Sequence, residues 1–315
     1  NLDNALRRLL RARFLLGMFD EPGKNAYDAI GEEAVACAEH KTLALRAAER
    51  ADVLLENNGI LPLDAGKLKK VALIGPNADS RSVLLGNYNG TPTEYSTSLK
   101  GLTDYLGADK IIYAKGCRLF GRNSERLLRE AERAALSADV VIACVGLDPS
   151  LEGEQGDAFN SDGSGDKTSL DIPPCQETLL RRLKATGKPV IAVLNTGSSV
   201  RIQTPGIDAV LNLWYPGEQG GAALARLLFG DVSPCGRLPM TFYCSVNDLP
   251  DFEDYSMRGR SYRYFEGEPL YPFGYGLTYT RFDYTGLQAA RTADGGAEVS
   301  LTLRNAGERD GLETV

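Results

Sequence analysis

The feature that most constrains the fold is an alternation of short apolar runs with helix-like segments across residues 71–229. Each apolar run is nearly continuous, which is typical of a strand that is covered on both faces. The alternation predicts an α/β fold, an α/β sandwich built on a mostly parallel sheet with helices on both faces. The predicted strands are Val71–Gly75, Lys110–Tyr113, Asp139–Gly146, Val190–Asn195 and Ala209–Trp214, and the predicted helices are Thr97–Leu106, Ser124–Ser137, Cys175–Thr186 and Gly217–Phe229.

Two helical stretches precede this alternation. Residues 2–19 place leucines, Phe14 and Met18 at helical spacing with arginines between them. Because one such helix cannot bury its apolar face alone, we expect it to be the last helix of a preceding domain. A connecting loop follows, and Glu32–Glu56 is the second predicted helical stretch.

The chain changes character after residue 230. Leu238–Phe242 is strand-like, whereas Asp248–Tyr279 has no periodicity and is rich in tyrosine and glycine. That segment is predicted to be a long ordered loop, and long loops in compact domains are usually functional or disordered. From Phe282 onward, alternating segments such as Ala297–Leu303 predict the opening strands of a β-sandwich.

Composition argues against several classes of protein. The 315 residues carry a net charge of -7, which does not suit a nucleic-acid-binding surface. No apolar run approaches the roughly 20 residues that span a bilayer. The six cysteines form no CxxC pair and there is one histidine, so no zinc site is predicted. The first residue is Asn1, and the chain is interpreted as a fragment with both natural ends missing.

The most informative segment for function is the polar loop at residues 146–170, between a predicted buried strand and a predicted helix. In open α/β sheets, ligands bind at the carboxyl ends of strands. The loop crowds Glu152, Glu154 and Asp157 together, with Lys167 as its single basic residue. Crowded carboxylates raise one another's pKa, which is how an enzyme keeps one carboxylic acid protonated near neutral pH. The alternative interpretation is a solvated charged loop.

Three other motifs fail on inspection. Residues 163–168 resemble a phosphate-binding loop, but Asp166 stands where the pattern needs glycine. Residues 160–163 resemble the middle of a calcium loop, but the register puts Ala158 at the first ligand position. Gly75-Pro76-Asn77 is not a dinucleotide-binding fingerprint. No cofactor and no metal ion is therefore predicted.

Two further loops follow predicted strands. Residues 86–90 offer Asn87 and Tyr88, a polar amide and a tyrosine of the kind that sugar recognition uses, or they serve as turn residues. Residues 214–221, WYPGEQGG, are interpreted as structural. Their two adjacent glycines permit close packing, and Glu218 suits the first turn of a helix.

Several motifs run in a fixed order along nearly the whole chain, and the ordered set is more specific than any one of them. They are VLLENN through LPL (53–63), VALIGPNAD (71–79), LLGNYNG (84–90), WYPGEQGG (214–221), LLFGDVSPCGRLPMTF (227–242) and YPFGYGLTYT (271–280). In these stretches the chain resembles the C-terminal portion of a glycoside hydrolase family 3 enzyme of the β-xylosidase/β-glucosidase type.

The resemblance implies an N-terminal (β/α)8 barrel, then the α/β sandwich, then a fibronectin type III-like β-sandwich. It places the end of the barrel at residues 1–22 and a linker with a helix at 23–67. The α/β sandwich is expected at 68–248, an aromatic-rich loop at 249–281, and a truncated fibronectin type III-like domain at 282–315.

The resemblance also implies site residues. The family's acid/base is a Glu in patterns such as Glu-Gly-x-Asp, and Glu154 has that spacing to Asp157. Glu154 is therefore the expected acid/base and Glu152 the reserve candidate. Asn87, Tyr88 and Asp157 are the expected substrate-binding residues. The family pattern continues with arginine, whereas this chain has an alanine followed by an insertion.

The implied function is a retaining, exo-acting glycoside hydrolase that removes β-linked xylose, or glucose, from non-reducing ends. We call residues 146–170 the acid/base loop. The start of this loop and the GNYNG loop resemble the β-xylosidase branch of the family more than the β-glucosidase branch. The alternatives are β-glucosidase and α-arabinofuranosidase. The nucleophile of this family is an Asp of the barrel. It is missing from this chain, so the fragment alone is predicted to be inactive.

The expected partners are an oligosaccharide or aryl glycoside substrate and the missing N-terminal barrel, with no nucleic acid and no membrane. A homo-oligomer is left open, as is the cellular compartment, for which the cytoplasm is slightly favoured. The rival function is a catalytically inactive carbohydrate-binding or scaffold fragment.

Overall fold

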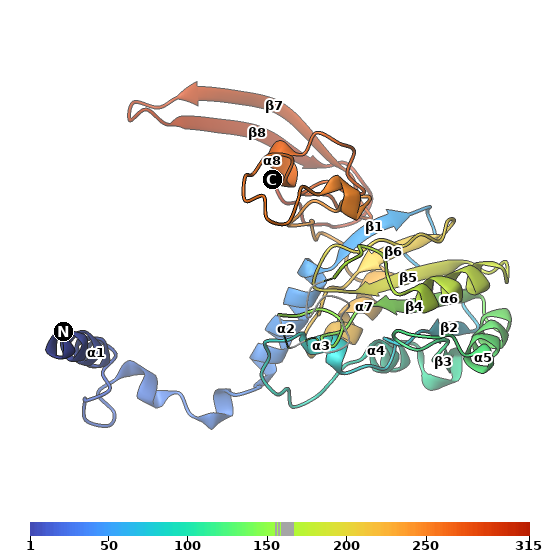
Figure 1. Cartoon of the computed structure of the whole chain (residues 1–315), viewed down its shortest axis with the longest axis horizontal. Helices are drawn as coiled ribbons and strands as arrows, with labels where there is room; N and C mark the ends of the chain where they lie inside the picture. Colours follow the sequence, from blue (N-terminus) through green and yellow to red (C-terminus); the bar gives the residue numbers. More distant parts are fainter. Residues whose placement is uncertain (155, 157, 159–166) are drawn as a thin grey trace. The chain divides into compact units, whose positions relative to one another are not determined.

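The computed structural model describes residues 1–154, 156, 158 and 167–315 (Figure 1). The chain divides into two compact units, Asn1–Leu43 and Ala44–Val315, each of which is described by itself. The five-part division predicted from the sequence stays a prediction. Asp157, one of the predicted site residues, lies outside the described part of the chain.

The first unit contains one long helix, two short ones and the first residues of α2 (Ala38–Ala51). The predicted N-terminal helix is confirmed as α1 (Leu2–Leu15), and two 3-10 helices follow, η1 (Ala26–Ala29) and η2 (Glu32–Ala34). The side chains of α1 are exposed except for the half-buried Leu10. Their exposure agrees with the expectation that this helix cannot bury its apolar face alone.

The second unit is built on a six-stranded sheet with the order β1-β6-β5-β4-β2-β3 (Figure 1). Neighbouring strands from β6 to β3 are parallel, as predicted, and β1 joins the edge antiparallel to β6. The strands are β1 (Val53–Asn57), β2 (Val71–Ile74), β3 (Ile111–Ala114), β4 (Val140–Gly146), β5 (Val190–Asn195) and β6 (Ala209–Asn212).

The helical stretch predicted over Glu32–Glu56 is wrong at both ends. Helix α2 occupies Ala38–Ala51 only, and the residues after it form the edge strand β1. Val53 pairs with Asn212 of β6, and the apolar start of β1 is buried against the sheet. This pairing with a strand far along the chain overrides a local preference for helix, which is a weak determinant.

Two hydrophobic cores cover the two faces of the sheet. Along β4, Val141 and Val145 face one core while Val140, Ile142 and Cys144 face the other. Helices α5 (Glu125–Leu136) and α6 (Pro174–Lys184) contribute to the first core, and α4 (Ser98–Leu106) and α7 (Gly220–Leu228) contribute to the second. The predicted α/β fold with helices on both faces is thereby confirmed. The shorter elements of this region are α3 (Ser82–Leu85) and η3 (Ala108–Lys110).

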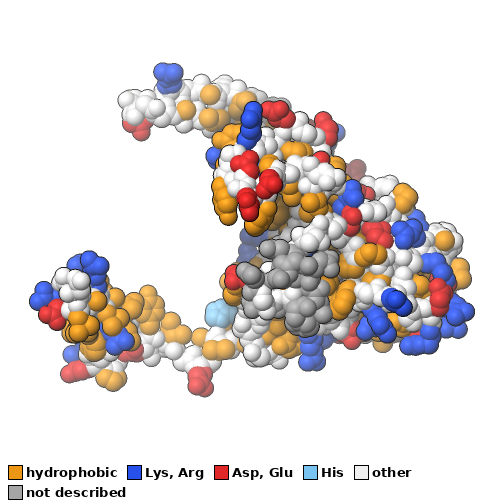
Figure 2. Space-filling view, in the orientation of Figure 1, with side chains coloured by type: hydrophobic (Ala, Val, Ile, Leu, Met, Phe, Trp, Pro, Cys, Tyr) orange, Lys and Arg blue, Asp and Glu red, His pale blue; other side chains and the backbone are white. Residues whose placement is uncertain are grey.

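The exposed sides of α5 and α6 carry many basic side chains, which Figure 2 shows in blue around this end of the domain. Several of them pair with acidic neighbours. Arg126 bonds Glu130 within α5, and Arg182 of α6 reaches Glu132 of α5. These basic residues are therefore partly neutralised by ion pairs across the helix surface.

The strand predicted at Leu238–Phe242 is wrong. Among the described residues, the only β-bridge of this segment is an isolated antiparallel one between Phe242 and Tyr271. The long loop that follows contains η4 (Val246–Asp248) and one helical turn, α8 (Ser261–Tyr264). The predicted strands after residue 282 are confirmed as the antiparallel pair of β7 (Phe282–Arg291) and β8 (Ala297–Asn305). Of the helices that the structure describes, none has the length and apolar character needed to cross a membrane.

Candidate functional site

The candidate site lies at the carboxyl edge of the sheet, where β4, β5 and β6 end beside one another. Gly146, the last residue of β4, pairs with Asn195, the last residue of β5. Ligands bind at this edge in open α/β sheets. Gln176 of α6 fixes the start of the loop after β4. Its Oε1 accepts from the Gly146 amide at 2.6 Å, and its Nε2 donates to the Gly146 carbonyl at 2.8 Å.

Glu152 is the buried carboxylate of this edge, with 9% of its surface exposed. Its Oε1 accepts from the Tyr215 hydroxyl at 2.5 Å and from the backbone amide of Gly197. Its Oε2 accepts from the Ser198 hydroxyl at 2.5 Å. Burial, and then the negative charge of Glu152, raise the pKa of Tyr215, so that its hydroxyl keeps the proton it donates. Both oxygens of the reserve acid/base candidate are thus engaged, as burial of a charge requires.

Glu154, the predicted acid/base residue, has an exposed side chain. Gly153, which separates it from Glu152, packs tightly against Asn87. A Cβ on Gly153 would lie 2.3 Å from Asn87 Nδ2, and the same Nδ2 donates to the Glu152 carbonyl at 3.2 Å. The two carboxylates therefore differ sharply in environment, because one is buried under donors and the other is exposed to solvent.

A cavity of about 400 Å³ opens beside Glu152, and the predicted residues Asn87 and Tyr88 both line it. Lys167 Nζ also lines the cavity and donates to the Ser199 carbonyl at 2.8 Å. Burial lowers the pKa of Lys167, and the charge of Glu152 opposes that shift. The lining residues are Asn87, Tyr88, Glu152, Gly153, Lys167, Gly197, Ser198 and Tyr215.

This lining suits a small polyhydroxylated ligand. Hydroxyl, amide and ammonium groups converge on a concave surface beside an aromatic ring, which is the composition of a small-molecule site with fixed polar contacts. Among the residues that the structure describes, no group of three or more His, Cys, Asp or Glu side chains is placed to hold a metal ion.

Sequence reasoning missed Ser198 and Tyr215 and gave no role to Lys167. Tyr215 stands in the stretch that was interpreted as structural, and Ser198 was not considered. Both follow the carboxyl ends of predicted strands, and that position was the signal that could have found them. Lys167 was noted only as the single basic residue of the acidic loop.

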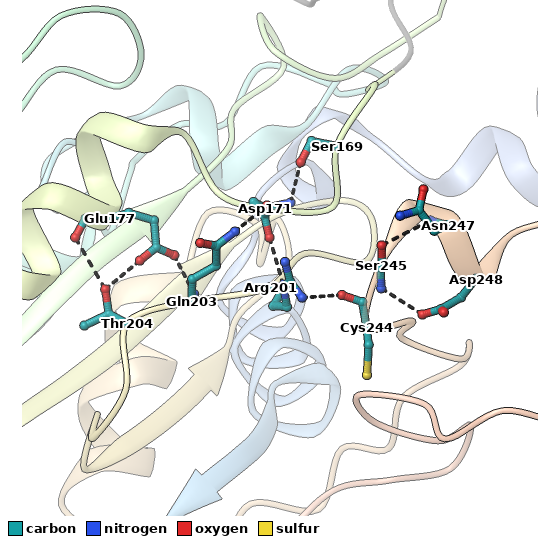
Figure 3. A network of polar contacts seen from close by, with 10 residues as sticks. All are labelled: Ser169, Asp171, Glu177, Arg201, Gln203, Thr204, Cys244, Ser245, Asn247 and Asp248. Atoms are coloured by element: carbon teal, nitrogen blue, oxygen red, sulfur yellow. Dashed lines mark hydrogen bonds and ion pairs between the residues drawn. The ribbon is translucent and has the colours of Figure 1, made fainter.

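A second set of contacts holds the far end of the acid/base loop (Figure 3). Asp171 forms a parallel bridge with Arg201, and its Oδ1 accepts from Arg201 Nε at 2.8 Å. Its Oδ2 accepts from Gln203 Nε2 at 2.6 Å. Figure 3 shows the Arg201 guanidinium between Asp171 and Cys244, to whose carbonyl it donates at 2.5 Å. Glu152 and Asp171 thus attach the two ends of the loop to the same segment after β5.

Comparison with known proteins shows which families share these features. The model of the glycosyl hydrolase family 3 C-terminal domain matches residues 52–279. A Beta-xylosidase of Formosa agariphila is 37% identical over 334 residues, which cover 100% of this chain and 44% of that protein. A Periplasmic beta-glucosidase of Salmonella typhimurium is 32% identical and is covered over 45% of its length, with 100% of this chain matched.

Comparison with solved structures gives the same kind of relative. The structure of a β-glucosidase from Erythrobacter marinus superposes with a TM-score of 0.80 at 35% sequence identity, covering 96% of this chain and 44% of that one. The chain therefore spans less than half the length of these three relatives.

Proposed function

This chain belongs to the glycosyl hydrolase family 3 C-terminal domain family, and on that premise we propose that it supplies the general acid/base of a retaining, exo-acting β-glycosidase. The observation that carries the proposal is the contrast between Glu152 and Glu154. The first is buried under four donors at the sheet edge, and the second is exposed two residues later. An acid/base residue must reach the substrate from a backbone that is held in place, and an exposed Glu154 two residues after the hydrogen-bonded Glu152 supports that role.

In the first step of this mechanism, the protonated Glu154 carboxyl donates its proton to the glycosidic oxygen as the bond to the anomeric carbon breaks. A carboxylate nucleophile attacks that carbon from the other face and forms a covalent glycosyl-enzyme. In the second step, Glu154 acts as a base and takes a proton from the water that hydrolyses this intermediate. Asn87, Tyr88 and Lys167 line the cavity next to Glu152, and we expect them to donate hydrogen bonds to sugar hydroxyls.

The nucleophile has to come from another part of the protein. The family resemblance implies an Asp of an N-terminal barrel, and the two carboxyl groups of a retaining enzyme lie about 5–5.5 Å apart. We therefore expect the isolated chain to have no glycosidase activity, and the native polypeptide that contains it to be active.

For the sugar, we propose a β-linked xylose in preference to glucose. Relatives named β-xylosidase, including that of Formosa agariphila at 37% identity, support this choice. The relative named periplasmic β-glucosidase, at 32% identity, makes glucose the alternative.

The test uses the native polypeptide with 4-nitrophenyl β-xyloside and 4-nitrophenyl β-glucoside. Glu154→Gln should lower kcat on unactivated aryl glycosides by about 10²–10⁴-fold, which is the usual contribution of general acid/base catalysis. On a 2,4-dinitrophenyl glycoside, whose leaving group needs no protonation, the loss in kcat/KM should be much smaller, whereas kcat should stay low because hydrolysis of the glycosyl-enzyme still lacks its base. In Glu154→Ala, added azide should restore turnover and give a glycosyl azide, because an anion needs no base to attack the intermediate.

Glu298→Gln is the matched control, since Glu298 is an exposed carboxylate on β8, and it should leave all rates unchanged. Turnover that survives Glu154→Gln on every substrate would rule out the assignment. A wild-type protein that binds xylose but hydrolyses neither glycoside would favour the rival carbohydrate-binding role.

A further inference from the structure

We propose that Glu152 is a positioning residue for the acid/base reaction: it holds the loop that carries Glu154 and takes no part in proton transfer. This inference rests on the proposed function of Glu154. It is drawn from the hydrogen bonds, burial and packing of Glu152 in this structure.

The first observation is the origin of the donors. Gly197 and Ser198 belong to the segment after β5, whereas Tyr215 belongs to the segment after β6. Glu152 itself comes from the loop after β4. One carboxylate therefore joins three connections at the sheet edge, and all three must keep their places for its hydrogen bonds to form.

The second observation is that two glycines, Gly197 and Gly153, leave room for close packing around Glu152. A Cβ on Gly197 would lie 3.2 Å from Glu152 Oε1 and 3.1 Å from Tyr215 Cε2, so a glycine here lets the carboxylate approach the backbone amide. A Cβ on Gly153 would meet Asn87 Nδ2 at 2.3 Å. The backbone just after Glu152 is therefore closely packed, as its side chain is.

The third observation is that only Gly153 lies between Glu152 and Glu154. Asn87 donates to the Glu152 carbonyl at 3.2 Å, so the peptide that leads into Gly153 is held by a segment other than those that bind the Glu152 side chain. The far end of the loop is attached separately, by Asp171 and Arg201. Among the described contacts, those of Glu152 are therefore placed to set the position of Glu154.

The expected effect follows from the sensitivity of catalysis to position. A displacement of about 1 Å in a reacting group can cost 10²-fold in rate. Glu152→Gln replaces an acceptor oxygen with an NH₂ group that would face the donors, and a buried donor without an acceptor destabilises the local structure. We expect kcat on 4-nitrophenyl β-xyloside to fall by about 10–100-fold, with KM changed by less than about 3-fold.

The decisive experiment is a double-mutant cycle in the native polypeptide. If Glu152 acts through Glu154, then Glu152→Gln should cost less than about 3-fold when Glu154 is already Gln, because there is no acid left to position. Added azide should not restore the activity of Glu152→Ala, whereas it should restore that of Glu154→Ala. Additive losses in the cycle, or azide rescue of Glu152→Ala, would overturn the proposal.

Glu177→Gln is the matched control. Glu177 of α6 is also a buried carboxylate that accepts two hydrogen bonds from the segment after β5, from the Gln203 amide at 2.6 Å and the Thr204 hydroxyl at 2.5 Å. Its substitution should lower stability without changing the dependence of rate on the leaving group. Tyr215→Phe and Ser198→Ala each remove one donor from Glu152. If Glu152→Gln does not fold, either of these two variants takes its place in the double-mutant cycle with Glu154→Gln.

Hydrogen exchange separates failure of this inference from failure of the proposed function. In Glu152→Gln, amide exchange at residues 151–154 should accelerate by more than about 10-fold beyond the change seen in the Glu177→Gln control. If the wild-type protein has no glycosidase activity, the proposed function is wrong. The exchange result then still shows whether Glu152 holds the loop. Unchanged exchange at these amides would defeat the positioning role even in an active enzyme.

Discussion

The Tyr215 hydroxyl lies 2.5 Å from Glu152 Oε1, although the two residues are 63 positions apart in the chain. Tyr215 lies three residues after the end of β6, and Glu152 stands in the loop after β4, two strands away in the sheet. This hydrogen bond is therefore a product of the strand order. It gives a buried carboxylate a donor at the point where the neighbouring Glu154 is exposed.

Tyr215→Phe tests the strength of this contact. A hydrogen bond to a charged group contributes about 1.5–3 kcal/mol, and its loss here leaves a buried carboxylate one donor short. We expect the free energy of unfolding to fall by that amount in urea denaturation at pH 7. Tyr279→Phe is the control, because the Tyr279 hydroxyl donates to a neutral carbonyl, that of Leu227 at 2.9 Å, and its loss should cost about 0.5–1.5 kcal/mol. Equal losses in the two variants would contradict a charged partner for Tyr215.

Asp52→Asn should change how stability depends on pH. Burial, with a smaller contribution from Glu49, raises the pKa of Asp52 well above its ordinary value, and no described residue donates a hydrogen bond to its carboxylate. The unfolded chain releases this proton near pH ~3.9, while the native protein still holds it. Because the native state then binds more protons than the unfolded state, wild-type stability should fall as pH rises above that value, until the folded pKa is passed.

Urea denaturation at pH 4, 6 and 8 measures this effect. The stability of Asp52→Asn relative to the wild type should grow with pH and reach a gain on the order of 1–3 kcal/mol, the usual cost of a buried polar group without a partner. Other carboxylates titrate in both proteins and cancel in the difference. A difference that stays constant from pH 4 to pH 8 would show that Asp52 ionises as freely in the native protein as in the unfolded chain.

Arg201→Ala should destabilise the far end of the acid/base loop. Its guanidinium bonds both the Asp171 carboxylate at 2.8 Å and the Cys244 carbonyl at 2.5 Å. Loss of these contacts is expected to cost about 1.5–3 kcal/mol in the free energy of unfolding. In contrast, Arg126→Ala removes an exposed pair with Glu130 on α5 and should cost at most about 0.5 kcal/mol. If the two variants lose equal stability in thermal or urea unfolding, Arg201 does not anchor the loop.

Gly221→Ala tests the close crossing of α4 and α7. A Cβ at Gly221 would lie 1.9 Å from the Thr97 carbonyl oxygen at the start of α4, so the helices would have to move apart. Overpacking of this kind costs about 1–3 kcal/mol. Gly90→Ala is the control, because a Cβ there meets nothing within 4 Å, and its effect should stay within about 0.5 kcal/mol. A fully stable Gly221→Ala protein would show that the helices separate at little cost.

Local sequence patterns predicted most of the fold. Apolar runs such as Val190–Asn195 are strands because they are covered on both faces, and covering requires the helices that alternate with them. The same reasoning failed for Val53–Asn57, since its neighbours on the amino-terminal side are helical and its partner β6 lies far along the chain. It also failed for residues 238–242, whose bridging partner Tyr271 belongs to a segment without periodicity.

For the candidate site, the sequence by itself determined that acidic residues follow a buried strand, at the edge where α/β folds bind ligands. It ranked Glu154 above Glu152 only through the family resemblance, because two carboxylates two positions apart have the same local chemistry. Only the tertiary structure decided that Glu152 is buried and that Glu154 is exposed. The donors to the Glu152 carboxylate are 44 to 63 residues away, and they meet its side chain only because β4, β5 and β6 end side by side.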